Sequence, residues 1–207
     1  MTHQRTAAVR RSTNETKIEV RLNLDGQGNR DITTELGFFD HLLAAWAKHS
    51  FFDLWVKAEG DLHIDGHHMV EDTGIVLGQA FAKAYGDGRG AARFGHSLLP
   101  MDEALVEAAV DISGRPFLSI ALNCPQAQVG SFDSCLFEEF LRGFVTQAGI
   151  TLHLRQLAGS NSHHILEAAV KALGRALSQA AALDPRIVGV HSTKGFLQLG
   201  RDAEENQ

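Results

Sequence analysis

Cysteine is scarce in this chain, and no stretch of it is rich in basic residues or in uninterrupted apolar residues. Cys124 and Cys135 are the two cysteines among 207 residues and form no C-x-x-C pair, which excludes a disulfide scaffold and favours a reducing cytoplasm. The apolar stretch 74–84 is broken by Gln79 and Lys83, and no apolar run has the length of a membrane span or the position of a secretory signal. Lysine and arginine total 19 against 25 acidic residues, so we expect neither a nucleic-acid partner nor membrane attachment.

Apolar periodicity predicts two similar halves. In the first half we expect a strand at 17–24 that forms a hairpin with 32–34, a helix within 38–50, strands at 53–58 and 62–64, and a helix at 67–85 that ends at Gly86. In the second half we expect strands at 104–111 and 116–122, a helix at 137–148, a strand at 150–156 and a helix at 163–182. Each half is interpreted as a strand-helix-strand-helix unit.

An internal repeat supports this interpretation. The segment FFDHLLAAWAKHSFFDLWVKAEGD aligns without a gap with the first 24 residues of LFEEFLRGFVTQAGITLHLRQLAGS, and HHMVE then aligns with HHILE with a few residues deleted. The predicted fold is therefore α+β, an internal duplication of the strand-helix-strand-helix unit with two mixed four-stranded sheets, each covered by a pair of helices. We expect a first repeat with an N-terminal arm over 1–92, a second repeat over 93–190, and a C-terminal substrate-binding segment with a disordered tail over 191–207.

Histidine is in excess, with 11 copies, and four of these form two adjacent pairs. Each pair begins an H-H-x-x-E motif at a helix start, where residues three and four positions apart share a face. Imidazole and carboxylate ligands of this kind suit manganese, iron or zinc better than magnesium or calcium. The repeat alignment adds one further candidate in each half. We therefore predict two metal ions with about four protein ligands each, among His41, His67, His68, Glu71, Glu139, His163, His164 and Glu167.

A structural role for each histidine is the alternative, because a lone histidine on a helix is more often a packed or solvated residue than a ligand. Two copies of H-H-x-x-E at equivalent positions of a repeat favour metal binding over that alternative. The motif differs from the H-E-x-x-H of zinc proteases, in which the glutamate is the base, so the glutamate is interpreted here as a ligand.

Candidate anion-binding groups are spread along the chain. One arginine follows a glycine-rich turn, which is usually only a turn, and another lies in DISGRP. The segment HSTKG is more informative, because two hydroxyls and an ammonium group beside a glycine form a compact site for an oxyanion. The sequence thus predicts a small phosphate site assembled from several loops, with the candidates Arg93, Arg115, Lys171, Ser192, Thr193 and Lys194.

These segments together resemble the imidazoleglycerol-phosphate dehydratase family over about residues 10–195. The resemblance is carried by NETKI, FFDHLL, GDLHID, HHMVEDTGIVLGQA, PMDEALVEAAVDISGRP, GITLHLRQLAGSNSHHILEAAVKALGRAL and STKG. It implies the removal of water from imidazole glycerol phosphate to give imidazole acetol phosphate, a step of histidine biosynthesis. It also implies a homo-oligomer of 24 subunits with active sites at the interfaces, two Mn²⁺ ions per subunit and no organic cofactor.

The resemblance also implies roles for individual residues. Glu15, from NETKI, becomes an acid/base candidate that contacts the substrate, with His41 and Glu167 as further catalytic candidates. The implied metal ligands are His41, His67, His68, Glu71, His163, His164 and Glu167. The implied contacts to the substrate phosphate or hydroxyls are Arg93, Arg115, Lys171, Ser192, Thr193 and Lys194.

Two positions depart from the pattern that the family usually shows. The family usually reads E-H-F-F where this chain has residues 138–141, so Glu139 stands where histidine is usual, and a carboxylate can also bind manganese. The family usually reads D-D-H-H where this chain has residues 65–68, so Gly66 removes a possible helix cap or a hydrogen-bond acceptor for a ligand.

The expected reaction removes a hydrogen from a carbon that no carbonyl group activates. An imidazolate held between two manganese ions could expel the C3 hydroxyl, after which a carboxylate takes the C2 proton. Glu15 is preferred over Glu167 as the proton carrier, because Glu167 is expected to be a ligand. Two other classes stay open on the residues alone: a binuclear metallohydrolase, which would use the same ligands to activate water, and a metal-storage or structural metal protein, which would not need the anion site.

Overall fold

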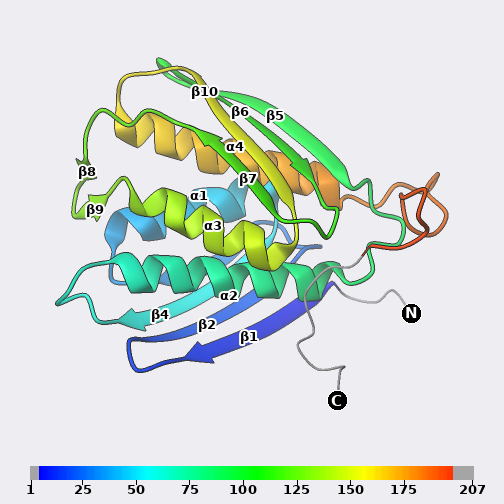
Figure 1. Ribbon diagram of the computed structural model, residues 1–207, viewed down its shortest axis with the longest axis horizontal. Coiled ribbons are helices and arrows are strands. Elements are labelled where there is room, and N and C mark those ends of the chain that lie inside the picture. The colour runs from blue at the N-terminus through cyan, green and yellow to red at the C-terminus, as the bar shows by residue number, and fades with distance from the viewer. Residues whose placement is uncertain (1–4, 198–207) are drawn as a thin grey trace.

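Residues 5–197 are described by a computed structural model of the chain, and they form two halves with the same order of main elements (Figure 1). The first half runs through β1 (Thr6–Ser12), β2 (Thr16–Asn23), β3 (Arg30–Thr33), α1 (Gly37–Ser50), β4 (Asp53–Gly60) and α2 (His67–Tyr85). The second half runs through β5 (Phe94–Met101), β6 (Ala104–Asp111), β7 (Phe117–Ala121), α3 (Leu136–Ala148), β10 (Thr151–Ala158) and α4 (Ser162–Ala181), with the short strands β8 (Gln128–Val129) and β9 (Phe132–Asp133) before α3. The disordered tail expected at the end of the chain lies outside the described residues.

The two four-stranded sheets have the same strand order. The first is ordered β1-β2-β4-β3 and the second β5-β6-β10-β7. In each sheet the last strand, β3 or β7, is parallel to its neighbour, and the other pairs are antiparallel. The strands β4 and β10 have eight residues each and occupy aligned positions of the internal repeat. The α+β fold with two mixed four-stranded sheets is confirmed.

The first hairpin differs from the expected one. Strand β2 pairs with β1, whereas β3 pairs in parallel with β4, so the expected pairing of 17–24 with 32–34 is wrong. The physical reason lies in the link between β2 and β3. The carboxylate of Asp53 at the start of β4 accepts hydrogen bonds from the backbone N–H groups of Gln27 and Asn29, both at 2.9 Å, and these hold the link beside β4.

Two other strand expectations also change. The sequence does not predict β1 and β5, which are edge strands, so each unit is strand-strand-strand-helix-strand-helix rather than strand-helix-strand-helix. The expected strand at 62–64 is a turn, closed by a 2.8 Å hydrogen bond from the Ile64 N–H to the Asp61 carbonyl, and the Ile64 side chain is 63% exposed. The other predicted helices and strands agree with the structure to within two residues.

The four helices form a layer between the two sheets (Figure 1). Helices α1 and α2 contact the first sheet and α3 and α4 the second, while α2 also packs against α3 and α1 against α4. Glycine permits this close approach: a Cβ atom on Gly74 of α2 would overlap the Phe140 carbonyl of α3, and Gly174 of α4 lies against the Trp46 carbonyl of α1. The two halves therefore meet through their helices. No helix in the described part of the chain is long and apolar enough to cross a membrane.

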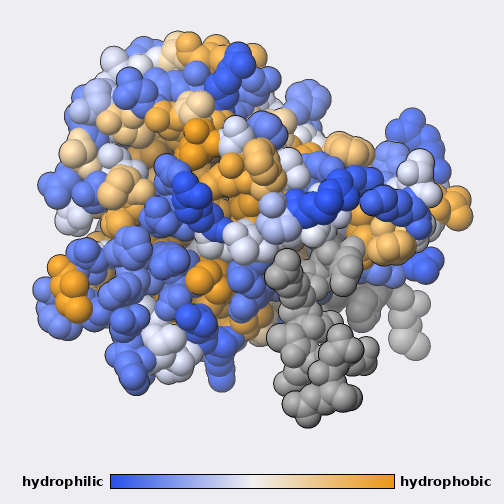
Figure 2. All heavy atoms as spheres, viewed as in Figure 1, coloured by the Kyte–Doolittle hydropathy of each residue, from blue (hydrophilic) through white to orange (hydrophobic). Residues whose placement is uncertain are grey.

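The outer faces of the two sheets differ in polarity. Side chains alternate across a strand, which places Phe94, Leu98, Phe117 and Leu157 on the face of the second sheet that points away from the helices. All four are large apolar side chains that are exposed. Figure 2 shows apolar surface gathered over the upper half of the view, where the second sheet lies, and a mostly hydrophilic lower edge over the first sheet. The second sheet therefore has an apolar outer face.

Candidate metal centre and anion site

The amino-terminal ends of the four helices meet at one end of the helix layer, on the left of Figure 1. The ring of Phe38 on α1 lies 4.9 Å from the ring of His163 on α4. Gly66, which precedes α2, lies against the side chains of Leu36 and Leu136 at the starts of α1 and α3. All eight predicted metal ligands fall within the first six residues of these helices. The fold therefore gathers them at one end of the molecule.

Three of these ligands form a tight cluster. The Nε2 atoms of His41 on α1 and His163 on α4 each lie 3.1 Å from Oε2 of Glu167. Across residues 5–197 this is the one group of three or more His, Cys, Asp or Glu residues whose ligand atoms all lie within 4.8 Å of one another. Two imidazole nitrogens and a carboxylate oxygen form a donor set that suits manganese, iron or zinc.

Lys171, a predicted substrate contact, lies at this cluster. Its Nζ is 2.6 Å from Oε1 of Glu167, one helical turn away. Burial opposes the ionisation of Glu167, but hydrogen bonds from Lys171 and His41 outweigh burial and lower the pKa of Glu167 to about 2. Glu167 is therefore a carboxylate, which is the form that binds a metal.

The corresponding set, His67 and Glu71 of the first repeat with Glu139 of the second, is spaced more widely. Nε2 of His67 lies 3.7 Å from Oε2 of Glu71 on the same helix. Glu139 on α3 lies 3.9 Å from Nε of Arg142 and does not join the other two in a metal-sized cluster of described residues. Because α3 packs on α2 as α1 packs on α4, the duplication gives Glu139 the place that His41 has in the other set.

The second histidine of each pair is held by a carboxylate that the sequence does not predict. Nδ1 of His68 lies 3.0 Å from Oδ2 of Asp61, and Nδ1 of His164 lies 2.7 Å from Oε2 of Glu103. An ionised carboxylate only accepts hydrogen bonds, so Nδ1 is the donor in both pairs and Nε2 is left for another partner. These bonds raise the pKa of both histidines. A carboxylate on the far nitrogen is the usual support of a metal-binding histidine.

Glu103 also holds the start of α4. Its Oε1 accepts hydrogen bonds from the backbone N–H groups of Asn161, at 2.9 Å, and Ser160, at 3.2 Å. The hydrogen bond from His164, followed by those from the two backbone groups, lowers the pKa of Glu103 to about 2. One carboxylate in the β5–β6 turn thus fixes both the loop before α4 and a candidate ligand on that helix.

Glu15 lies in the β1–β2 turn beside the start of α2. Its Oε1 is 4.0 Å from Nε2 of His68, and its side chain is 56% exposed. The Thr13 hydroxyl accepts hydrogen bonds from the N–H groups of Glu15 and Thr16, at 3.1 and 2.9 Å. The Thr16 hydroxyl donates to the carboxylate of Asp72 on α2. The turn is therefore tied to the helix that carries the first histidine pair, while the Glu15 carboxylate stays accessible.

Gly66 immediately precedes helix α2 and, without a side chain, supplies no cap. Asp65 supplies the bond instead, since its Oδ1 accepts from the N–H of His67 at 2.8 Å. Asn161 does the same for His163 at the start of α4, at 2.9 Å. The loss of an acidic side chain at position 66 therefore leaves the helix start capped.

Two of the predicted anion-binding arginines meet at the other end of the second sheet. Arg93 donates from Nε and Nη2 to the two carboxylate oxygens of Asp111, at 2.7 and 3.1 Å. Its Nη1 donates to the His191 carbonyl at 3.0 Å. Nη2 of Arg115 lies 3.9 Å from Oδ2 of Asp111. The sequence does not predict Asp111 as part of this site.

The STKG segment begins beside these arginines, because its preceding residue, His191, is bonded to Arg93. Ser192 closes the segment into a turn: its hydroxyl accepts from the Lys194 N–H at 3.2 Å, and its carbonyl accepts from the Gly195 N–H at 3.0 Å. Thr193 and Lys194 are exposed in this turn. The predicted phosphate contacts are therefore gathered here, apart from Lys171.

The length of helix α4 separates the metal cluster from the anion site within one chain. His164 lies at the start of the helix, whereas the backbone N–H of Arg93 donates to the carbonyl of Ala180 near its end, at 2.8 Å. Sixteen residues of α-helix span about 24 Å. One chain therefore does not bring its candidate metal ligands and its candidate anion-binding residues together.

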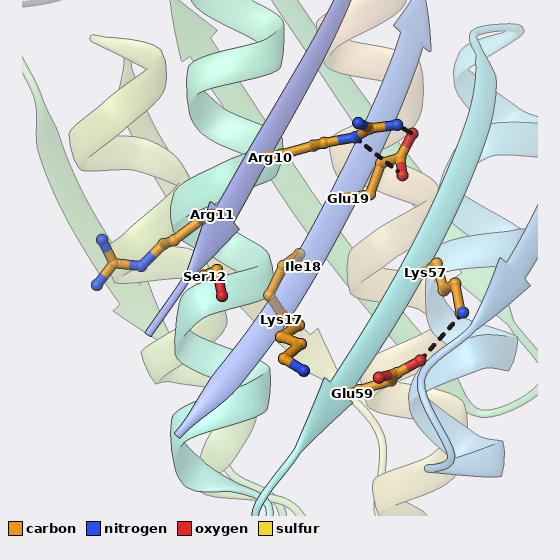
Figure 3. Close-up of a pocket in the computed structure, with 8 residues that line it drawn as sticks. All are labelled: Arg10, Arg11, Ser12, Lys17, Ile18, Glu19, Lys57 and Glu59. Carbon is orange, nitrogen blue, oxygen red and sulfur yellow. Dashed lines mark hydrogen bonds and ion pairs between the residues drawn. The ribbon is translucent and has the colours of Figure 1, made fainter. Parts of the chain in front are cut away.

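A shallow groove on the outer face of the first sheet lies apart from both sites (Figure 3). Its charged side chains are mostly paired with one another: Nε of Arg10 lies 3.1 Å from Oε2 of Glu19, and Nζ of Lys57 lies 3.0 Å from Oε1 of Glu59. No histidine or cysteine is among the residues that line it. The groove is a solvated, charge-paired sheet face rather than a second candidate centre.

Comparison with known proteins identifies the family to which the chain is similar. The imidazoleglycerol-phosphate dehydratase family profile matches residues 34–177. The chain is 58% identical over 193 residues to imidazoleglycerol-phosphate dehydratase of Thermoanaerobacter pseudethanolicus, which covers 93% of this chain and 100% of that protein. It is 56% identical over 194 residues to that of Gluconacetobacter diazotrophicus, which covers 93% and 98%.

Solved structures give the same result. The crystal structure of imidazoleglycerol-phosphate dehydratase from Staphylococcus aureus superposes with a TM-score of 0.79 at 37% identity, over 86% of this chain and 99% of that one. The structure of the Pyrococcus furiosus protein in complex with (S)-C348 gives 0.79 at 38% identity, over 91% and 100%. The chain therefore belongs to the imidazoleglycerol-phosphate dehydratase family, the lyases that carry out this dehydration in histidine biosynthesis.

Proposed function

We propose that the chain dehydrates imidazole glycerol phosphate to imidazole acetol phosphate with two bound Mn²⁺ ions and no organic cofactor. The observation that carries this proposal is the cluster of His41, His163 and Glu167, whose ligand atoms lie within 4.8 Å of one another. Such a set of nitrogen and oxygen donors fits a divalent ion of this class. These residues would hold one ion. A second ion would be held by the matching set, His67 and Glu71 of the first repeat with Glu139 of the second.

His68 and His164 would supply the remaining protein ligands. Their Nδ1 atoms are bonded to Asp61 and Glu103, so each presents Nε2 to a metal. Manganese, when bound, would supply the Lewis acidity that lets the substrate ring bind as an imidazolate between the two ions. In this arrangement both histidine pairs serve the same centre.

Glu15 would move the proton at C2 of the substrate. Its carboxylate lies beside the first histidine pair, 4.0 Å from His68, and is 56% exposed. A general base needs this kind of access to the atom that it deprotonates. Glu167 is less suited to the task, because its oxygens are bonded to two histidines and to Lys171.

Arg93, Arg115 and the segment 192–194 would bind the substrate phosphate. Two guanidinium groups and an ammonium group match the charge and the oxygens of a phosphate. Holding the phosphate fixes the carbon chain relative to the metals, which is a positioning contribution. Lys171, at the metal end, would contact a substrate hydroxyl.

We further propose that a second copy of the chain completes each site. The metal cluster and the anion site are about 24 Å apart along α4. A substrate that carries its ring and its phosphate on one three-carbon chain has too few bonds to span that distance, since each is about 1.5 Å long. The apolar outer face of the second sheet offers a surface for association. This supports a homo-oligomer, for which we propose 24 subunits with active sites at the interfaces.

Two further assignments remain our proposals. One is the division into 1–92, 93–190 and 191–207. The other is a cytoplasmic location, which the free thiols of Cys124 and Cys135 support.

An anaerobic assay tests the proposed reaction. Purified protein is stripped of metal and incubated with imidazole glycerol phosphate and Mn²⁺, Fe²⁺, Zn²⁺ or Mg²⁺ in turn. We expect imidazole acetol phosphate to form and Mn²⁺ to restore activity at about two ions per chain. Release of inorganic phosphate without dehydration would favour a metallohydrolase, and full activity after chelation would contradict the metal proposal.

The proton carrier is tested by Glu15→Gln, which keeps the side-chain shape and removes the base. We expect kcat to fall by about 10²–10⁴ with unchanged metal content. Glu19→Gln, on the outer face of the same hairpin, is the matched control. Full kcat in the Glu15→Gln enzyme would assign the proton to another group.

A further inference from the structure

We propose that Asp111 is a positioning residue for the phosphate site, an inference that rests on the proposed function and extends it to a residue outside the predicted set. Asp111 ends β6, directly opposite Phe94 of β5. From this place its carboxylate contacts both arginines that would bind phosphate, Arg93 immediately before the neighbouring strand β5 and Arg115 four residues further along the chain. A single carboxylate therefore lies within ion-pair distance of two cations that are distant in the sequence.

The contact between Asp111 and Arg93 has two hydrogen bonds and is largely buried. Both carboxylate oxygens accept from the guanidinium, at 2.7 and 3.1 Å, and the side chains of Arg93 and Asp111 are only 14% and 22% exposed. The Arg93 backbone has a φ of 72°, which is rare for a residue other than glycine. Its guanidinium carbon also lies 4.7 Å from the centre of the Phe94 ring. The backbone and the surrounding side chains thus direct Arg93 to this carboxylate.

These hydrogen bonds do not use all of the guanidinium N–H groups of Arg93, so some remain available for a ligand. A guanidinium has five N–H groups. Asp111 accepts two of them and the His191 carbonyl accepts a third, at 3.0 Å. Two N–H groups remain for phosphate oxygens, beside the start of the STKG segment. Asp111 therefore orients the arginine without using all of its donors.

Electrostatics and positioning predict opposite effects of removing the Asp111 charge. A negative charge beside an anion site repels the anion, so its removal alone would tighten phosphate binding. Without the carboxylate, however, Arg93 and Arg115 repel each other and Arg93 loses the acceptor that fixes its orientation. If Asp111 is a positioning residue, phosphate binding weakens although the site becomes more positive.

The test measures phosphate affinity in the metal-loaded, full-length enzyme, with inorganic phosphate as the probe in calorimetry and as a competitive inhibitor. For Asp111→Asn we expect phosphate affinity to fall about tenfold and KM for the substrate to rise by a similar factor, while kcat changes less than about threefold. Asp87→Asn makes the same charge change in an exposed pair with Arg89 and should alter neither value. Unchanged or tighter phosphate binding by Asp111→Asn would overturn the proposal.

Two further variants separate positioning from a general loss of structure. Asp111→Glu keeps the charge but shifts both oxygens, so it should weaken phosphate binding as well, and wild-type affinity in a folded Asp111→Glu enzyme would overturn the proposal even if Asp111→Asn does not fold. In an Arg93→Lys background, Asp111→Asn should change phosphate affinity less than about twofold, and a full tenfold loss there would show that Asp111 does not act through Arg93. Phosphate binding is measured without turnover, so a protein that shows these effects but lacks dehydratase activity would contradict the proposed function alone.

Discussion

The hydroxyl of Thr16 donates a hydrogen bond to the carboxylate of Asp72, a residue of α2 that is 7% exposed. The other oxygen of Asp72 accepts from Nε of Arg11 at 3.1 Å. Both strands of the hairpin that carries Glu15 are therefore fastened to α2 next to the predicted ligand Glu71. These two bonds hold Glu15 in position relative to the predicted metal ligands on α2.

Removal of the Thr16 hydroxyl should weaken this connection. Thr16→Val leaves the buried Asp72 without one donor, so we expect the free energy of unfolding to fall by about 1–2 kcal/mol. We also expect kcat to fall, because Glu15 is held less well, whereas Thr16→Ser should preserve both values. Urea unfolding and steady-state kinetics measure the two effects. In a Glu15→Gln background, Thr16→Val should not lower kcat further, and an additive loss would separate Thr16 from the action of Glu15.

Removal of the Glu103 charge should weaken metal binding. Glu103→Gln deprives His164 of the carboxylate that fixes the proton on Nδ1, and changes of this kind typically cost 10–100-fold in metal affinity. Competition with a chromogenic chelator measures the affinity. Glu59→Gln, an exposed carboxylate paired with Lys57 on the first sheet, is the control. Equal affinity in Glu103→Gln and the control would contradict a role for His164 as a ligand.

Substitution of Glu139 should affect the binding of one of the two proposed metal ions and leave the other bound. Glu139→Ala should reduce the manganese content from about two ions per chain towards one, because the set on α2 loses a ligand. Glu139→His restores the residue that the family usually has and should keep both ions. Glu138→Ala, which removes the neighbouring exposed partner of Arg142, is the control. Elemental analysis that finds two ions in Glu139→Ala would show that Glu139 is not a ligand.

Asp53 should contribute to stability in a pH-dependent way. Burial disfavours its charged form, but hydrogen bonds from the N–H groups of Gln27 and Asn29 outweigh burial and lower its pKa below the usual 3.8. A lowered pKa means that the stabilisation is present above about pH 4 and is lost as the pH falls through the folded-state value. Asp53→Asn should therefore lower the free energy of unfolding by about 1–2 kcal/mol at pH 7 and by less at pH 3. Urea unfolding at the two pH values tests this, with the exposed Asp31→Asn as control, and an equal loss at both would contradict the ionised role.

The parts of the fold that could be predicted are those with a strong local pattern. Helix α2 and strand β6 have the predicted limits, because their apolar periodicity is clear and Gly86 ends the helix. The edge strands β1 and β5 could not be predicted in this way. An edge strand has a neighbour on one side only, and β1 buries few side chains. Its own sequence therefore gives little indication that it forms a strand.

The site shows the same contrast between local and distant relationships. The predicted ligands His163 and Glu167 are one helical turn apart, and helix geometry predicts that they meet. The internal repeat predicts His41 as a candidate, but not that it meets these two residues, which the packing of α1 against α4 brings about. Glu103 and Asp111 could not be predicted, because each acts on a residue that the pairing of strands and helices brings to it, and an isolated acidic residue in a strand or turn has no distinctive pattern.

The pairing of α2 with α3 and of α1 with α4 has a consequence for the symmetry of the fold. Each helix of one half buries a face against a helix of the other half, so a single unit on its own would leave those faces exposed to water. Two identical copies of one unit, related by a twofold axis, would cover them in the same way. A twofold pair of half-length units would therefore reproduce the helix contacts of this molecule, and the joining of both halves in one chain lets equivalent positions carry different residues, as His41 and Glu139 do.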